Sequence, residues 1–325
     1  MLIRLPRIWD VPDHLVTPEQ LYLDRRRFLR GAGRAAAGLA LAELFGCEDT
    51  LQPRFGRQAV PPMAMLAAAR NPKFADAGRP LSDEAAVAAF NNYYEFGVTK
   101  HIAAAAQALP VTPWAVEVGG LVHNPKTYAI EDLSRLFPLE ERVYKHRCVE
   151  AWSMTVPWTG FPMKLLLQAA DPKPEAQFVT FTSYHNDAVQ PGPGFGGEKL
   201  PWPYEENLRL DEMANELAFF ATGIYGHDLP KQHGAPLRQC LPWKYGFKGA
   251  KSIVKITFTD RRTPTFWNTL APDEYDFEAN IDPEKPHPRW SQATERVLDY
   301  GEEWLWRRSP TLKYNGYGEY VAGLY

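Results

Sequence analysis

The chain has 325 residues, of which 45% are hydrophobic and 13% aromatic, so it can bury a substantial core without disulfides or metals to hold the fold together. Its formal charge of -3 and its scattered lysines and arginines exclude the basic stripe that nucleic-acid binding requires, so we expect no nucleic-acid partner. The 29 prolines and 10 tryptophans favour fixed loops and a pocket built from loops.

The N-terminal residues have the pattern of an export signal. Residues 24–30 hold an arginine pair, a spacer, Phe-Leu and a further arginine, directly before an apolar run over 35–45. That run is shorter than the roughly 20 residues that a membrane-spanning helix needs. A buried amphipathic helix is the alternative, but only Glu43 gives the run a polar face. We therefore predict a twin-arginine signal over 1–46, removed after export of the folded protein to the periplasm, a route that often serves proteins carrying a cofactor.

The three cysteines, Cys47, Cys148 and Cys240, have neither an even number nor a paired spacing, so they predict no disulfide framework, zinc site or iron-sulfur cluster. Cys47 either leaves with the signal or marks a lipid-attachment site, and the bulky Phe45 argues against the second. The other two remain in an oxidising compartment, where a reactive unpaired thiol is a liability unless something holds it. Metal ligation would hold it.

Beyond the signal, the pattern predicts a helical N-terminal lobe over 47–110 and a mixed domain over 111–325. The lobe contains predicted helices over 64–70 and 83–91, the second capped by Ser82. The mixed domain has predicted strands over 114–118, 125–130, 178–182 and 252–258, a turn at 119–120, and helices from residue 130 and over 162–170. This order predicts an α+β fold.

Two further stretches are predicted to be irregular. Residues 192–197 are rich in glycine, but they neither follow a clear strand nor begin a helix, so an exposed loop is favoured over a dinucleotide site. Residues 263–325 are dense in Pro, Trp and Tyr with little periodicity, and we expect them to wrap around the core.

The stretch over 145–154 is the most informative for chemistry. Cys148 is flanked by His146 and Arg147, and neighbouring positive charge lowers a thiol pKa and favours the thiolate, which is both a nucleophile and a soft metal ligand. A buried structural cysteine is the alternative, and local chemistry leaves both open.

Residues 147–152, Arg-Cys-Val-Glu-Ala-Trp, resemble the metal-binding motif of the sulfite oxidase superfamily, in the variant of the catalytic subunits of periplasmic protein-methionine-sulfoxide reductases. Residues 233–238 and 249–252 resemble the pterin-binding segment of that superfamily, in the same order and at a similar separation. The sequences at 91–96, 243–248, 271–275 and 287–296 also resemble segments of this subfamily. The resemblance covers nearly all of the chain beyond the signal.

The resemblance implies a sulfite-oxidase-type molybdopterin-binding fold that holds a mononuclear molybdenum with one pterin, with the Cys148 thiolate as the metal ligand. Arg238 would donate two hydrogen bonds to the pterin phosphate, and the Lys251 ammonium would add a compact positive charge for the cofactor. His233 stands where the subfamily carries Asn, and Ser183 where Thr is expected, and either side chain would serve. By position, the implied cofactor contacts are Asn91, Tyr94, Glu95, Cys148, Ser183, His233, Arg238, Gly249, Ala250 and Lys251. Taken singly, many of these residues could equally pack, cap a helix or form an ordinary ion pair.

Glu150 is the second predicted catalytic residue. On strand spacing it would point to the same side as Cys148, where it could tune a metal-bound water or relay a proton. A simple ion pair with Arg147 or Lys145 is equally open. Tyr225 and Trp243 are either part of the substrate mouth or core packing, and core packing is favoured for Trp243.

The reaction implied by the resemblance is oxygen-atom abstraction from methionine sulfoxide residues in oxidised periplasmic proteins. The electrons would come from a membrane haem b subunit of the MsrQ type, which would pair with a monomeric catalytic subunit as a heterodimer. The alternatives are reduction of small S- or N-oxides and a sulfite-oxidising activity, although a negative Glu150 would repel sulfite. A non-catalytic binding protein with the same fold would have lost Cys148, which is present.

Overall fold

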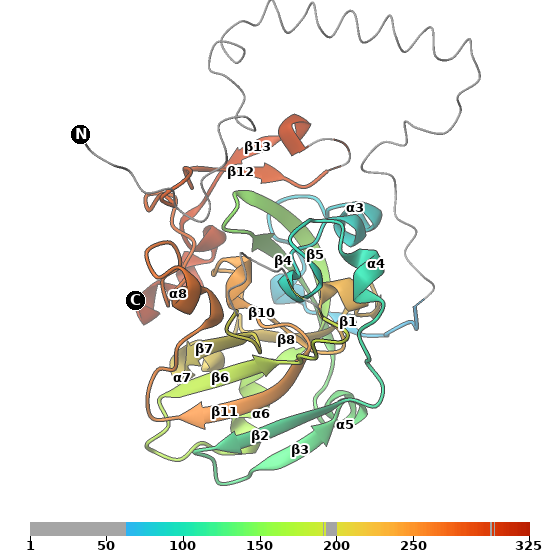
Figure 1. The fold of residues 1–325 in the computed structure, drawn as a ribbon, viewed down its shortest axis with the longest axis vertical. Coiled ribbons are helices and arrows are strands. Elements are labelled where there is room, and N and C mark those ends of the chain that lie inside the picture. Colours follow the sequence, from blue (N-terminus) through green and yellow to red (C-terminus); the bar gives the residue numbers. More distant parts are fainter. Residues whose placement is uncertain (1–62, 191, 193–199, 300, 302) are drawn as a thin grey trace, which may run out of the picture. The chain divides into compact units, whose positions relative to one another are not determined.

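The computed structural model describes residues 63–325, apart from 191, 193–199, 300 and 302 (Figure 1). The predicted export signal, Cys47 and most of the glycine-rich stretch over 192–197 lie outside these residues. In the described part, no helix is long and apolar enough to cross a membrane.

The larger of two sheets carries the β4–β5 hairpin. Strand order runs β1-β4-β5-β12-β13, and β5 also pairs with β8, which continues the sheet to β9 and β10. Its strands are β1 (Ala69–Arg70), β4 (Glu140–Arg147), β5 (Trp152–Pro162), β8 (Phe219–Ile224), β9 (His227–Asp228), β10 (Arg238–Cys240), β12 (Thr294–Val297) and β13 (Arg308–Pro310).

The second sheet has the order β3-β2-β11-β6-β7 and lies in the lower part of Figure 1. Its strands are β2 (Ala115–Gly120), β3 (Lys126–Ala129), β6 (Phe178–Ser183), β7 (Glu205–Arg209) and β11 (Ile253–Thr259). Along β2, Val116 and Val118 are buried between exposed neighbours, as a half-buried strand requires. The strands predicted in this region are confirmed, but Gly119 and Gly120 continue β2 rather than forming a turn.

The helices are short and surround the sheets. They are α3 (Glu84–Ala89), α4 (Ala103–Ala106), α5 (Ile130–Leu136), α6 (Met163–Ala170), α7 (Leu210–Ala214), α8 (Phe266–Leu270) and α9 (Gly318–Val321). Single 3-10 turns are η2 (Pro72–Phe74), η3 (Tyr94–Phe96), η4 (Lys231–His233), η5 (Gly246–Lys248), η6 (Glu303–Leu305), η7 (Lys313–Gly316) and η8 (Ala322–Leu324). The mixture of helices and strands confirms the predicted α+β class.

Two predictions near the N-terminal end of the described chain are wrong. Residues 64–70 form no helix, because Ala69 and Arg70 pair with Glu140 and Glu141 of β4, and this tertiary pairing overrides the helix propensity of the alanines. Ser82 does not cap α3. Its backbone N–H donates to the Thr155 carbonyl of β5 and its hydroxyl accepts from the Thr155 N–H, so Asp83 caps the helix instead.

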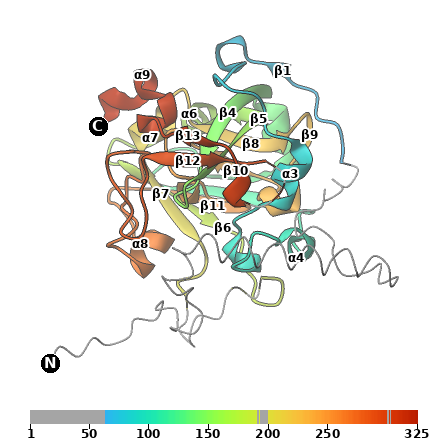
Figure 2. The same cartoon turned by 90° about the horizontal axis from the view of Figure 1, so that it is seen from above.

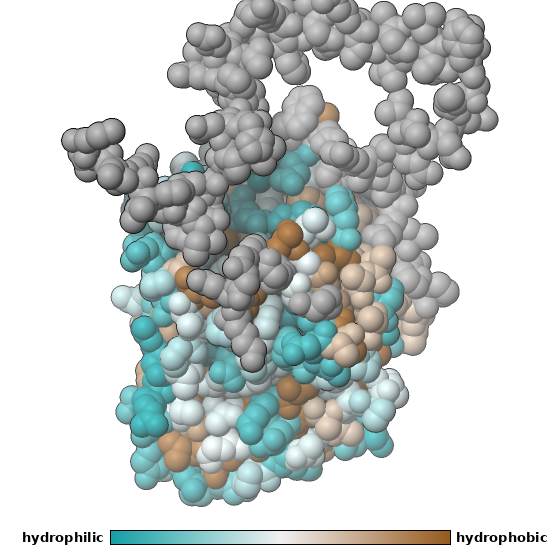
Figure 3. All heavy atoms as spheres, in the orientation of Figure 1, coloured by the Kyte–Doolittle hydropathy of each residue, from teal (hydrophilic) through white to brown (hydrophobic). Residues whose placement is uncertain are grey.

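The C-terminal region does more than wrap the core. Strand β12 pairs parallel with the start of β5, with Arg296 opposite Trp152, and β13 pairs with β12. Figures 1 and 2 show this orange-red pair beside the hairpin formed by β4 and β5. On the face drawn in Figure 3, hydrophobic side chains are interspersed among hydrophilic ones.

Candidate active site

A pocket of about 850 Å³, including its open mouth, lies where several connecting segments meet. The segment after α3, the β4–β5 connection, η4, β10, η5 and α8 all contribute to its walls. The lining residues are Phe90, Asn91, Asn92, Tyr94, Glu95, His146, Cys148, Val149, Glu150, Trp152, Met154, Tyr204, Gln232, His233, Arg238, Gly246, Phe247, Lys251, Trp267 and Tyr275.

Cys148 is the first residue of the hairpin loop, by which we mean residues 148–151 between β4 and β5. Strand pairing stops at the Arg147–Ser153 pair, so the loop backbone leaves the sheet there. Ala151 has φ of 63°, a left-handed conformation that is uncommon for a residue with a side chain. The thiol of Cys148 is free and buried, and it faces the pocket.

Glu150 lies beside the Cys148 sulfur, with Oε2 3.7 Å from Sγ. The prediction that the two residues share a side is confirmed, but the reason differs: a turn, not strand alternation, brings them together. Oε2 accepts hydrogen bonds from Lys100 Nζ at 2.5 Å, Asn92 Nδ2 at 3.1 Å and Trp152 Nε1 at 3.1 Å. The ion-pair partner of Glu150 is therefore Lys100, and neither Arg147 nor Lys145.

These contacts decide the charge of the site. Burial raises the pKa of Glu150, but the charge and hydrogen bond of Lys100 outweigh burial, and the pKa lies below its usual value. Burial and the nearby Glu150 raise the pKa of the Cys148 thiol to about 12. Without a metal the thiol is neutral and the carboxylate is charged. Binding to a metal ion would remove the thiol proton.

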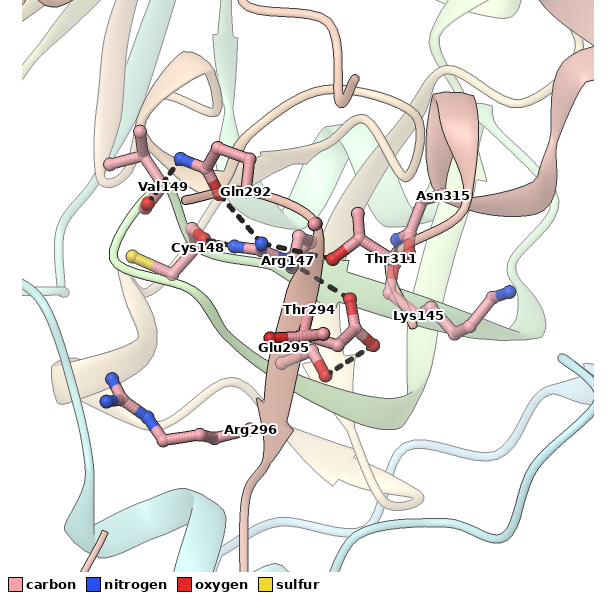
Figure 4. Close-up of polar contacts among 12 residues, drawn as sticks. Lys145, Arg147, Cys148, Val149, Gln292, Thr294, Glu295, Arg296, Thr311 and Asn315 are labelled. Carbon is pink, nitrogen blue, oxygen red and sulfur yellow. Dashed lines mark hydrogen bonds and ion pairs between the residues drawn. The ribbon is translucent and has the colours of Figure 1, made fainter. Parts of the chain in front are cut away.

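The predicted lowering of the Cys148 pKa by its two flanking residues is wrong. The pKa of His146 is held well below its usual value by burial and by Arg238, so the imidazole is neutral. The guanidinium of Arg147 is fully buried and ion-paired to Glu295 at 3.1 Å. Figure 4 shows the sulfur of Cys148 pointing away from this guanidinium.

The other end of the pocket carries buried positive charge. Arg238 is 3% exposed, and its Nη1 donates to the His233 carbonyl while its Nη2 has no hydrogen-bond partner among the described residues. Lys251 is half-buried, and burial and Arg238 lower its pKa to about 8 although Glu95 raises it. Burial raises the pKa of Glu95 to about 7. This end is therefore short of negative charge.

Most of the predicted cofactor contacts meet in this pocket, and three do not line it. Ser183 lies at the end of β6 with a buried hydroxyl that has no partner in the described part of the chain. The N–H groups of Gly249 and Ala250 already donate to the Gly246 carbonyl and the Gln239 side chain. The cofactor contacts implied for these three residues stay predictions.

Several residues of the pocket are not predicted by the sequence motifs. Asn92 donates to Cys148 Sγ at 3.3 Å, whereas the predicted cofactor contact is its neighbour Asn91. No sequence pattern marks Lys100 as a site residue, because its partner Glu150 lies 50 positions away in the chain. Tyr225 and Trp243 do not line the pocket, and Trp243 is fully buried core, as favoured for it.

The residues present fit a metal-bearing anionic cofactor. A soft thiol at one end suits a metal such as molybdenum, and an unsatisfied guanidinium donor with a lysine at the other end suits a phosphate group. Gly246 lets the His146 ring pack against the pocket wall, because a Cβ there would lie 2.5 Å from His146 Nε2.

The family model and the curated relatives agree with this fit. The family model described as oxidoreductase molybdopterin binding domain matches residues 103–267. The protein-methionine-sulfoxide reductase catalytic subunit MsrP of Burkholderia mallei is 45% identical, over 97% of this chain and 93% of that protein. Those of Ralstonia nicotianae and Gluconobacter oxydans are each 44% identical, over 100% of this chain and 97% and 96% of their own lengths. A solved structure, the sulfane dehydrogenase SoxCD of Paracoccus pantotrophus, aligns with TM-score 0.45 and 17% identity over 58% of this chain and 49% of that one.

Proposed function

This chain belongs to the family of protein-methionine-sulfoxide reductase catalytic subunits (MsrP), and from that premise we propose that it returns methionine sulfoxide residues of exported proteins to methionine. The observation that carries the proposal is the free Cys148 thiol in the pocket, 3.7 Å from Glu150.

The cofactor we propose is a mononuclear molybdenum with one pterin. Cys148 would bind the metal, and Arg238 and Lys251 would hold the phosphate end, where the chain leaves an unsatisfied donor and excess positive charge. When bound, this cofactor supplies the two-electron removal of oxygen from the sulfoxide.

Glu150 has the position of a proton relay. Lys100, Asn92 and Trp152 all donate to its Oε2, and among the described residues no donor contacts Oε1. The free oxygen can accept a proton from water and pass it toward the oxygen that leaves the substrate. Lys100 keeps the carboxylate charged between turnovers.

The charge near the sulfur also bears on the substrate. A sulfoxide is neutral, whereas sulfite is an anion that the ionised Glu150 would repel. The pocket lining also includes the aromatic side chains of Tyr94, Trp267 and Tyr275, which suit the apolar part of a methionine side chain. Reduction of small S- or N-oxides is the second function that these features allow.

The proposal extends to export and to an electron donor. The twin-arginine pattern at residues 24–30 supports export of the folded protein to the periplasm. A catalytic subunit that acts there needs electrons from outside, and we propose a membrane haem subunit of the MsrQ type as the donor to a monomeric catalytic subunit.

The test is oxidation of a reduced viologen dye by the molybdenum-loaded protein, supplied in turn with a sulfoxide-containing peptide, dimethyl sulfoxide, an amine N-oxide and no substrate. We expect peptide-dependent turnover that vanishes in Cys148→Ala. Cys240→Ala is the matched control, because Cys240 is also free and buried but does not line the pocket, and it should keep wild-type turnover. Loaded protein that oxidises the dye no faster with the sulfoxide-containing peptide than with no substrate would contradict the proposal.

A further inference from the structure

Each carbonyl of the hairpin loop accepts a hydrogen bond from Arg147 or from a residue outside the hairpin. The Cys148 carbonyl accepts from Arg147 Nη1, and the Val149 carbonyl accepts from Trp290 Nε1 at 2.8 Å and Gln292 Nε2 at 2.7 Å. The Glu150 and Ala151 carbonyls accept from Arg296, through Nη2 at 3.1 Å and the backbone N–H at 2.9 Å. Residues 290–296, here called the bracing segment, therefore contact three successive peptide groups of the loop.

The bracing segment is itself fixed by the guanidinium of Arg147. Arg147 Nε pairs with Glu295 at 3.1 Å, and Nη2 donates to Gln292 Oε1 at 2.7 Å and to Thr311 at 3.3 Å. Glu295 also accepts from Ser153 of β5 at 2.8 Å. Figure 4 shows Gln292, Glu295 and Thr311 around the Arg147 guanidinium, with the Cys148 sulfur pointing away from them.

The loop needs such support, because its own sequence does not favour its shape. Tight hairpin connections with left-handed residues are usually built from Gly, Asn or Asp, and residues 148–151 contain none of these. Ala151 holds φ of 63° in spite of its side chain. Residues in such conformations persist where surrounding contacts over-determine them.

The hydrogen bonds are placed on the loop rather than on the strands. The β4–β5 pairing and the β12–β5 pairing already join these strands without the side chains of Gln292 and Arg296. What those two side chains add is the orientation of the peptide groups that carry Cys148 and Glu150.

We propose that the bracing segment sets the direction of the Cys148 sulfur and the Glu150 carboxylate, and that Gln292 and Arg296 are positioning residues for the reductase. The inference rests on the proposed function in one respect, the binding of molybdenum by Cys148. A shift of the sulfur would alter the metal site and the distance to Glu150 together, and misplacement of about 1 Å costs an enzyme up to about a hundredfold in rate.

The experiment compares Gln292→Ala and Arg296→Gln with Asn315→Gly in the molybdenum-loaded protein. Asn315 is the matched control, because it is a buried amide in the same C-terminal region that donates to the Lys145 and Pro242 carbonyls and does not touch the loop. We expect both bracing variants to change the electron paramagnetic resonance spectrum of the half-reduced molybdenum and to lower kcat about tenfold or more with little change in KM. The control should keep the wild-type spectrum and kcat.

Hydrogen exchange supplies a readout that does not depend on the metal. The Ala151 N–H donates to the Cys148 carbonyl at 3.1 Å, and its exchange should quicken in the bracing variants and not in Asn315→Gly. If Gln292→Ala does not fold, Arg296→Gln provides the test. The Arg296 side chain is 26% exposed, so its replacement should disturb the fold less. An unchanged spectrum, kcat and exchange rate in a folded bracing variant would overturn the inference, as would equal changes in the control. Loaded wild-type protein that reduces no sulfoxide would end the proposed function and leave the spectral comparison valid.

Discussion

Two groups of buried charges in this chain differ in how their charges are balanced. In the core, Lys244 and Glu212 are both fully buried and lie 2.6 Å apart, and Lys244 also donates to the Asn280 side chain at 3.0 Å. In the pocket, by contrast, the charge of Glu95 acts on Lys251, whereas Arg238 forms no ion pair in the described part of the chain and one of its guanidinium nitrogens has no hydrogen-bond partner there.

The difference shows which group of buried charges is neutralised within the protein itself. A buried ion pair satisfies its own charges, so its removal affects the fold. A buried cluster with unequal charges is costly until a ligand supplies the missing charge, so its removal should affect the ligand more than the fold. Three changes test whether the core charges serve the fold and the pocket charges serve the ligand.

The largest effect is expected from Lys244→Met. The change leaves Glu212 buried without its cation, and we expect the free energy of unfolding to fall by about 3–5 kcal/mol. Urea denaturation measures this loss, and neutralising the partner as well, in Lys244→Met with Glu212→Gln, should recover part of it. Molybdenum content per folded molecule should stay at the wild-type level, and a loss of metal would show that the two groups are not separate.

The second effect is expected from Arg238→Met. The pocket loses a cation that has no anionic partner of its own, so the cofactor-free fold should keep its stability or gain slightly. The molybdenum retained through purification, measured by mass spectrometry of the metal, should fall about tenfold or more, because a charge-assisted contact to phosphate is lost. A large loss of stability with unchanged metal would make Arg238 a structural residue like Lys244.

The smallest effect concerns pH and Glu95. Burial raises the pKa of Glu95 in the folded protein from 4.5 to about 7, so between these values the folded state binds more protons than the unfolded state. The cofactor-free protein should therefore lose stability as pH rises through this window, by up to about 3 kcal/mol, and Glu95→Gln should flatten the loss. Thermal unfolding between pH 4.5 and 7 measures it. Parallel curves for the wild type and the variant would show that Glu95 does not titrate there.

Local patterns predicted the parts of the fold that depend on neighbours in sequence. Alternation predicted β2, the local residue pattern predicted β6 and β11, and the proline-led apolar stretch predicted α6. The alanines of residues 64–70 misled the prediction, because their partners in β4 lie some seventy positions further along the chain. Propensity carries no information about such a partner.

The sequence by itself determined the chemical identity of the site: a lone cysteine in a distinctive motif, followed two residues later by a carboxylate, and a second block with Arg238 and Lys251. Only the tertiary structure decided that Arg147 turns to Glu295, that Lys100 pairs with Glu150, and that residues 290–296 hold the loop. The physical reason is that the pKa of a side chain and its direction are set by burial and by contacts, and here the decisive contacts join residues 50 to 148 positions apart.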